Sequence, residues 1–151
     1  VDQETLLAHV DRFLARWSSH GRPVQAAATV LHGQFLAVGA LIDDDAPNAG
    51  VSGCGIDKLM HAVEEAGNAV GATWADGLLV VFEGADGEVQ VVPRSTFRAL
   101  AREGHVDGDT PVFVTTITSV GALRVEGIRR LARESWHGRT FRLGPPQTTA
   151  A

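Results

Sequence analysis

The chain has 151 residues and a mass of 16.0 kDa, is 44% hydrophobic and 21% charged, and carries a formal net charge of −5. This composition suits one soluble domain and argues against a second. One cysteine excludes an intrachain disulfide framework, and neither a membrane span nor a signal-peptide pattern is present, so we expect a cytoplasmic protein with no membrane association. The first residue is Val1 rather than Met, which leaves an upstream element open.

Apolar spacing predicts helix, hairpin and helix in the first half. Residues 2–17 place large apolar side chains three and four positions apart, as in an amphipathic helix. Residues 24–31 and 34–42 are short apolar runs joined by two residues, which predicts a β-hairpin. After an acidic loop over 43–53, we expect a second helix over 56–67. Its packing face would hold Ile56, Leu59, Met60, Val63 and Ala66.

The second half predicts a hairpin, a helix, a strand and a final helix. Residues 78–83 form a continuous apolar run typical of a strand buried on both faces, and 88–92 would be its hairpin partner. A helix is expected over 93–103, a valine- and threonine-rich strand over 111–118, and a weakly amphipathic helix over 123–133.

The order α-ββ-α-ββ-α-β-α predicts an α+β fold. We expect a single domain over 1–143, with a mostly antiparallel sheet of about five strands covered by helices. Residues 144–151, rich in glycine, proline and threonine, are predicted to be a disordered tail.

Charge is distributed unevenly along the chain. Residues 1–120 carry 16 acidic and 7 basic groups, whereas residues 121–151 carry 2 acidic groups and 6 arginines. The acidic net charge argues against a general nucleic-acid binder. Two interpretations of the basic end stay open: its arginines pair with the acidic body, or they form an anion or phosphate site. The arginines of such a site would be Arg129, Arg130, Arg133 and Arg139.

The only cysteine, Cys54, lies in the sequence Ser52-Gly53-Cys54-Gly55-Ile56-Asp57, directly before the second predicted helix. The helix dipole favours a thiolate at this end, and the flanking glycines leave the sulfur and nearby backbone N–H groups open to an anion. The alternative is a small buried cysteine in a tight turn. Asp57 is expected either to cap the helix or to act as an acid or base.

Two histidines follow predicted helices and stand close to a tryptophan that could anchor them: His20 near Trp17, and His137 beside Trp136. Either histidine could act as a base towards Cys54, join a metal set, or cap a helix end. His61 projects onto the helix face of Asp57 and Glu65, so we do not expect it to assist Cys54.

Several function classes lack their signatures. No paired spacing of cysteine and histidine supports a zinc site, so neither a metal nor another cofactor is expected. No Walker A loop is present, and the single lysine, Lys58, does not lie in one, which excludes an ATPase of the P-loop type. The chain has no tyrosine and offers no aromatic ladder for single-stranded nucleic acid.

Four elements together resemble a family of small bacterial proteins, common in the Bacteroidetes lineage and often labelled "ABC transporter ATPase". They are Trp17-x-x-His20-Gly21, the run from Phe35 to Ala40, Ser52-Gly53-Cys54-Gly55-Ile56-Asp57, and Glu134-Ser135-Trp136-His137. The resemblance spans most of the chain, although Gly55 replaces the usual serine. It implies an upstream strand in relatives, and one pocket that Trp17/His20, Cys54/Asp57 and Trp136/His137 share. The ATPase label is not transferred, because the phosphate-binding loop is missing.

Three hypotheses about function stay open. The leading one is a small-ligand or thiol-dependent pocket that gathers Cys54, Asp57, His20 and His137, with Cys54 as nucleophile if it is an enzyme. Further ligand contacts would come from Ser52, Gly53, Gly55, Trp17 and Trp136. The second hypothesis is a protein-interaction or oligomerisation module, and the third is phosphate or nucleic-acid binding by the C-terminal arginines. The partner is accordingly a small molecule or a protein, with a homo-oligomer left open.

Overall fold

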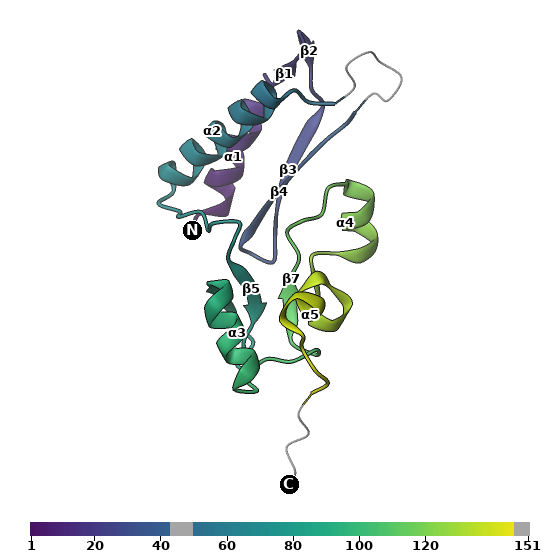
Figure 1. Cartoon of the computed structure of the whole chain (residues 1–151). Coiled ribbons are helices and arrows are strands. Elements are labelled where there is room, and N and C mark those ends of the chain that lie inside the picture. The colour runs from purple at the N-terminus through teal and green to yellow at the C-terminus, as the bar shows by residue number, and fades with distance from the viewer. Residues whose placement is uncertain (43–49, 147–151) are drawn as a thin grey trace. The chain divides into compact units, whose positions relative to one another are not determined.

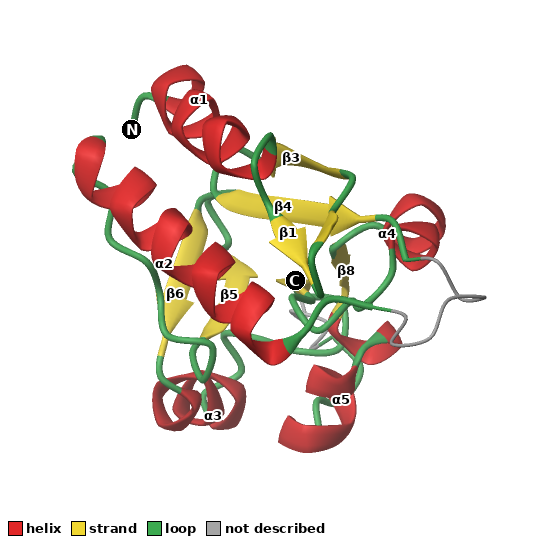
Figure 2. Ribbon diagram, turned by 90° about the horizontal axis from the view of Figure 1, so that it is seen from above, coloured by secondary structure: helices red, strands yellow, loops and turns green. Residues whose placement is uncertain are grey.

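The computed structural model describes residues 1–42 and 50–146, and it divides into two compact units. Unit 1 is Val1–Trp74 and unit 2 is Ala75–Ala151, and each has its own hydrophobic cluster. Both units combine helices with antiparallel strands, which confirms the predicted α+β class (Figures 1 and 2). The proposed extent of one domain over 1–143 stays a prediction.

Unit 1 begins with α1 (Gln3–Leu14), which buries Leu6, Val10 and Leu14 along one face. The Asp2 carboxylate caps the helix, accepting hydrogen bonds from the Thr5 amide at 3.0 Å and the Thr5 hydroxyl at 2.6 Å. These bonds lower the pKa of Asp2. The helix ends three residues before its predicted end at residue 17, but Trp17 is still buried against the same cluster.

Two hairpins follow α1. The first joins β1 (Ser18–Ser19) to β2 (Arg22–Pro23) through His20 and Gly21, whose φ angles of 53° and 72° are those of a type I′ turn. The second joins β3 (Ala26–Leu31) to β4 (Phe35–Ala40). Its connection has three residues rather than the predicted two, because Leu31 pairs directly with Phe35.

One face of the β3–β4 hairpin packs into the cluster of unit 1. α1 lies against both β3 and the helix α2 (Gly53–Ala69), as the ribbon of Figure 1 shows. Alternate strand residues supply the apolar contacts, because side chains on a strand alternate between its two faces. These residues are Ala26, Ala28, Val30, Leu36, Val38 and Ala40.

The predicted packing face of α2 was right in Leu59 and Ala66, which lie in the cluster of unit 1, and wrong in Ile56 and Met60. Ile56 and Met60 are 47% and 53% exposed, whereas the buried residues of the helix are Gly55, Ala66 and Gly67. Small residues let neighbouring groups approach closely: the Trp74 ring lies on Gly67, and its indole nitrogen donates to the Val63 carbonyl at 3.2 Å. The helix therefore packs through its small side chains, together with Leu59.

Unit 2 contains a four-stranded antiparallel sheet in the order β6-β5-β7-β8. Its strands are β5 (Val80–Glu83), β6 (Val89–Val92), β7 (Pro111–Phe113) and β8 (Arg129–Leu131). Its helices are α3 (Arg94–Arg102), α4 (Val120–Glu126), the 3-10 turn η1 (Ala132–Glu134) and α5 (Trp136–Phe141).

Three phenylalanine rings pack together at the centre of the unit 2 core. Phe97 of α3 is fully buried, with ring centroids 5.2 Å from Phe82 of β5 and 4.8 Å from Phe141 of α5, in edge-to-face geometry. Val80, Val106 and Val112 complete the packing around these rings. The core thus ties α3 and α5 to the sheet.

Three predictions in unit 2 need correction. β5 buries Val80 and Phe82 but leaves the side chains between and after them half-buried, so one face is buried rather than both. The strand predicted over 111–118 is only three residues long. The helix predicted over 123–133 is two elements, because Gly127, with φ of 64°, ends α4 and the chain then pairs with β7 as β8.

The structure describes only part of the predicted tail, 144–151, and of the predicted acidic loop, 43–53. The carbonyl of Gly144, in the predicted tail, accepts from the Gly108 amide at 2.9 Å, so the chain is held at this point. The rest of that tail, 147–151, and most of the acidic loop, 43–49, lie outside the described residues. Within the described ranges, no helix combines the length and apolar character that crossing a bilayer requires.

Candidate functional site

Two serines fix the N-terminus of α2. The Ser52 hydroxyl caps the helix by accepting from the Gly55 amide at 3.0 Å. Ser19, from the β1–β2 hairpin, accepts from the Ser52 amide at 2.9 Å and donates to the Ser52 hydroxyl at 3.2 Å. The two hydroxyls are thus bonded to each other and to backbone amides, so the first turn of α2 is anchored to the preceding hairpin.

Trp17 adds a third anchor from the end of α1. Its indole nitrogen donates a buried hydrogen bond of 3.0 Å to the Gly55 carbonyl. The backbone is tight here, because a Cβ on Gly55 would lie 2.8 Å from Cγ1 of Val51 and 3.3 Å from the Ser52 hydroxyl. Trp17, Ser52 and Gly55 are therefore engaged with the protein itself, and their predicted ligand contacts stay a prediction.

Asp57 does not cap α2. The cap is Ser52, and the first turn holds no acidic residue, since Asp57 is the fifth residue of the helix. The helix starts three residues earlier than predicted, which moves Asp57 out of the first turn. Its carboxylate is exposed and lies on the outer surface of the helix.

A depression of about 380 Å³ lies along this outer surface. Cys54, which is exposed, lines it together with Asp57, Lys58, His61 and Glu65 of α2. These positions repeat at three- and four-residue spacing, which places them on one stripe of a helix. Phe13 of α1 forms part of the wall. The thiol, one amine, one imidazole and two carboxylates of α2 thus lie along one side of a single, open hollow.

His61 is the imidazole closest in sequence to Cys54 along this stripe. Its Nε2 lies 3.4 Å from Oε1 of Glu65, and both side chains are more than two-thirds exposed. The predicted alignment of His61 with Asp57 and Glu65 is confirmed by this geometry. His61 and Cys54 both line the same hollow, and the expectation that His61 does not assist Cys54 stays a prediction.

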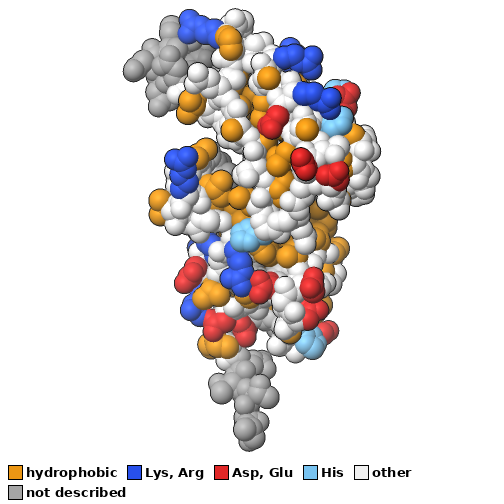
Figure 3. Space-filling view, turned by 180° about the vertical axis from the view of Figure 1, so that it is seen from behind, with side chains coloured by type: hydrophobic (Ala, Val, Ile, Leu, Met, Phe, Trp, Pro, Cys, Tyr) orange, Lys and Arg blue, Asp and Glu red, His pale blue; other side chains and the backbone are white. Residues whose placement is uncertain are grey.

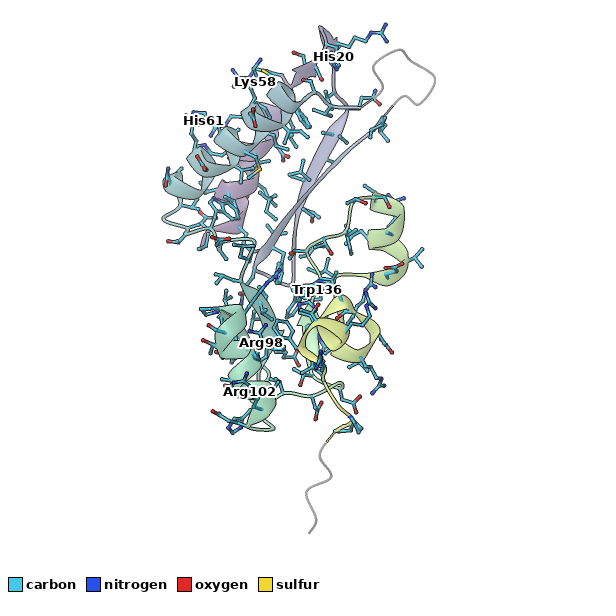
Figure 4. All side chains as sticks on the ribbon, viewed as in Figure 1. His20, Lys58, His61, Arg98, Arg102 and Trp136 are labelled. Carbon is cyan, nitrogen blue, oxygen red and sulfur yellow. The ribbon has the colours of Figure 1, made fainter. Side chains whose placement is uncertain are left out.

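His20 is an exposed turn residue. It occupies the left-handed conformation at the β1–β2 turn, next to Ser19, which anchors Ser52. Figure 4 shows His20 at this turn, with Lys58 and His61 farther along α2. The histidine is not one of the side chains that line the hollow. Its predicted role as a base stays a prediction.

His137 belongs to unit 2, where it is 1% exposed. The Ser135 hydroxyl donates to the Ala132 carbonyl at 3.0 Å, so it accepts from Nδ1–H of His137 at 2.9 Å. The imidazole stacks on Trp136 with ring centroids 3.8 Å apart. Burial, assisted by the nearby Arg94 cation, lowers the pKa of His137 to about 4. The ring is therefore neutral at pH 7.

Three of the six arginines in residues 121–151 form ion pairs, whereas Arg139, the fourth arginine of the predicted anion site, is in none of the ion pairs of the described residues. Arg129 forms a two-pronged pair with Glu83 of β5, at 2.9 and 3.0 Å, which raises the pKa of Arg129. Arg130 pairs with Glu126, and Arg133 pairs with Asp109. These contacts favour the interpretation in which the basic end pairs with acidic groups.

Sequence reasoning missed Ser19 and undervalued Lys58. The signal for Ser19 was its position two residues after Trp17, which puts both on the segment that meets α2, but a lone serine carries no pattern. Lys58 stands four residues after Cys54 on the same helix, a spacing that places two side chains on one face. In the described parts of the chain, no three histidine, cysteine or acidic side chains come close enough to hold a metal.

Comparison with protein-family models, curated proteins and solved structures finds no match for this chain. The resemblance to the small bacterial family therefore stays a prediction. Function has to be inferred from the residues themselves.

Proposed function

We propose that unit 1 binds a small molecule in the hollow along α2, and that the thiol of Cys54 is the group that contacts or attacks it. The observation that carries the proposal is the exposed Cys54 at the second position of an anchored helix, at the rim of a depression of about 380 Å³. Small-molecule sites typically measure about 300–1,000 Å³.

The lining combines a mostly apolar surface with charged and polar side-chain groups at its edge. Lys58 supplies a cation and His61 an imidazole, while Asp57 and Glu65 supply carboxylates. The amide groups in the first turn of α2 carry the partial positive charge of a helix N-terminus, which stabilises a thiolate or an oxyanion. A ligand with an electrophilic carbon and an adjacent oxygen would use both features.

In the enzymatic form of the proposal, the carbon belongs to a carbonyl group: the Cys54 sulfur adds to it, a histidine takes the thiol proton, and the electron pair of the C=O π bond moves to the oxygen, which becomes an oxyanion. His20 follows Ser19, which is bonded to Ser52 at the α2 N-terminus, and His61 lines the hollow. His137 is less suited to this proton transfer, because a base whose pKa is about 4 holds a proton weakly at neutral pH.

Because the chain has one cysteine, covalent labelling reads this site alone. The test is a set of small chloroacetamide and acrylamide fragments, incubated with the folded protein and followed by intact mass. We expect selected fragments to react at least about tenfold faster than with free cysteine, and to be slowed in Lys58→Gln and His61→Gln variants.

A matched control is available in His105→Gln. His105 is an exposed histidine of unit 2 whose Nε2 lies 3.5 Å from Glu103, much as His61 faces Glu65. This variant should leave the labelling rate unchanged. If each fragment labels the protein as fast as it labels free cysteine, and the His61→Gln variant is labelled at the same rate, the thiol is only a surface group.

A second candidate function is protein interaction through α2. Ile56 and Met60 lie one turn apart on α2, and each is about half exposed, so the helix presents two large apolar side chains to solvent. A Met60→Glu variant tests this function. If the surface mediates self-association, the molar mass from light scattering falls to that of one chain, whereas labelling of Cys54 is retained.

A further inference from the structure

Unit 2 contains nine arginines and nine acidic residues, but they are not paired evenly. Carboxylates pair with Arg129, Arg130 and Arg133, which lie on or next to β8. α3 contains three further arginines and no acidic residue within its bounds. Across the described residues, no ion pair joins these three to a carboxylate. They are Arg94, Arg98 and Arg102, and all are exposed.

The three arginines form a row along α3. They recur every four residues, which places neighbouring side chains on adjacent turns of one face, about 6 Å apart along the axis. Figure 4 shows Arg98 and Arg102 on successive turns, with Trp136 on α5. On the face drawn in Figure 3, both acidic and basic side chains occur.

Aromatic rings hold two of these arginines. The guanidinium carbon of Arg94 lies 5.3 Å from the ring centre of Trp136, and that of Arg98 lies 5.7 Å from the ring centre of Phe141. An arginine resting on a ring keeps its N–H edges available for hydrogen bonds and loses less conformational freedom when it binds an anion. The rings belong to α5, so packing of the unit 2 core sets the positions of the arginines.

We propose that this face of α3 binds an oligophosphate, with Arg94, Arg98 and Arg102 as its ligands. Guanidinium groups match phosphate oxygens in pairs, and a row of them suits a ligand with several phosphates rather than a single anion.

The surroundings exclude base stacking as the main source of affinity. One face of Trp136 stacks on His137 and Arg94 lies over the ring, so the indole offers no open platform for a nucleobase. The net charge of −5 also opposes a long nucleic acid. A short phosphate chain, free or as the tail of a nucleotide, needs no stacked base and carries far less charge than a long nucleic acid.

The test is calorimetric titration of the full chain with inorganic tripolyphosphate at physiological salt. We expect binding that weakens at least about tenfold in the double variant Arg94→Gln/Arg98→Gln, since each lost charged hydrogen bond is worth about that factor. The double variant Arg124→Gln/Arg142→Gln removes the same charge from exposed arginines outside α3, and should weaken binding less than about twofold. Arg98→Lys should bind with intermediate affinity because it keeps the charge but not the paired geometry.

A second measurement locates the site even where a variant folds poorly. In a ¹⁵N spectrum of the unaltered protein, tripolyphosphate should shift the indole N–H signal of Trp136. The signal of Trp17, which is bonded to Gly55 in unit 1, should stay in place. A Trp136→Phe variant assigns the signal.

Titration with ATP distinguishes the two phosphate sources. Affinity equal to that of tripolyphosphate assigns the site to nucleotide tails, and much weaker affinity assigns it to free polyphosphate; both agree with the proposal. Three results overturn it: no binding of tripolyphosphate, equal weakening in both double variants, or equally tight binding of hexaglutamate. None of these measurements involves Cys54, so the proposed function of unit 1 stands or fails separately.

Discussion

The indole nitrogen of Trp17 donates to the backbone carbonyl of Gly55, joining positions 38 residues apart by a buried bond of 3.0 Å. This bond connects the segment after α1 to the first turn of α2. Because Cys54 directly precedes Gly55, the same bond fixes the backbone beside the thiol.

Replacing Trp17 by Phe should destabilise unit 1 by about 1–3 kcal/mol, because the Gly55 carbonyl loses its buried donor while most of the apolar ring contact is kept. Chemical denaturation followed by circular dichroism measures the loss. Trp74→Phe is the matched control: it removes a similar indole bond, to Val63, from a ring that is 38% exposed. An equal loss of unfolding free energy in both variants would contradict the claim that the Trp17 bond matters because it is buried.

Gly55→Ser should also destabilise the protein, by about 1–3 kcal/mol, because the new Cβ would lie 2.8 Å from Cγ1 of the stiff, β-branched Val51. Gly53→Ser is the control, since a Cβ there has no neighbour within 4 Å; its effect should stay within about 0.5 kcal/mol. Thermal melting of the two variants compares them directly. A stable Gly55→Ser protein would show that Val51 moves aside readily.

Acid should weaken the fold through His137. Its folded-state pKa of about 4 lies below the ordinary 6.5, so between these values the unfolded chain binds a proton that the folded chain does not. The stabilisation is complete above about pH 6.5 and is lost as pH falls towards 4, with a total of about 3 kcal/mol.

The measurement is the unfolding free energy of the unaltered protein and of the His137→Gln variant, each at pH 7 and at pH 4.5. The gap between them should shrink by about 2–3 kcal/mol at the lower pH. His105→Gln, which removes an exposed histidine of the same unit, is the control. If the difference in unfolding free energy between the unaltered protein and His105→Gln shrinks by as much between pH 7 and pH 4.5, burial of His137 is not the cause.

Ser135→Ala should cost about 2 kcal/mol or more, because the hydroxyl both caps α5 and accepts from the buried imidazole of His137. Ser119→Ala removes a comparable cap from α4 at an exposed site, and should cost only about 0.5–1 kcal/mol. Urea unfolding of both variants compares the two losses of unfolding free energy. Similar losses would mean that the bond to His137 contributes little.

The helices with large apolar stripes were predictable, as α1 shows: Leu6, Val10 and Leu14 repeat every four residues and are all buried. The orientation of α2 was not predictable by the same rule, because its contacts use Gly55, Ala66 and Gly67, which add little to an apolar pattern. The prediction therefore placed the large side chains Ile56 and Met60 in the packing face with Leu59 and Ala66, whereas only the last two lie in the cluster.

β8 could not be recognised from local sequence. Arg129–Leu131 is a strand because it pairs with Pro111–Phe113, and such a distant partner leaves no mark on the three residues themselves. The candidate site was partly predictable: the glycines and serine around Cys54 marked a helix start, whereas the hollow depends on Phe13 of α1. The arginine row of α3 was visible as a spacing, but its lack of acidic partners needed the structure.

The division of the core has a consequence for synthesis of the protein. Every buried member of the first cluster lies before Trp74, and every buried member of the second lies after it. The ribosome therefore completes one full set of apolar partners before the other emerges, and domains generally fold in the order of their translation. We expect Val1–Trp74 to acquire protease resistance on a stalled nascent chain while unit 2 is still being made.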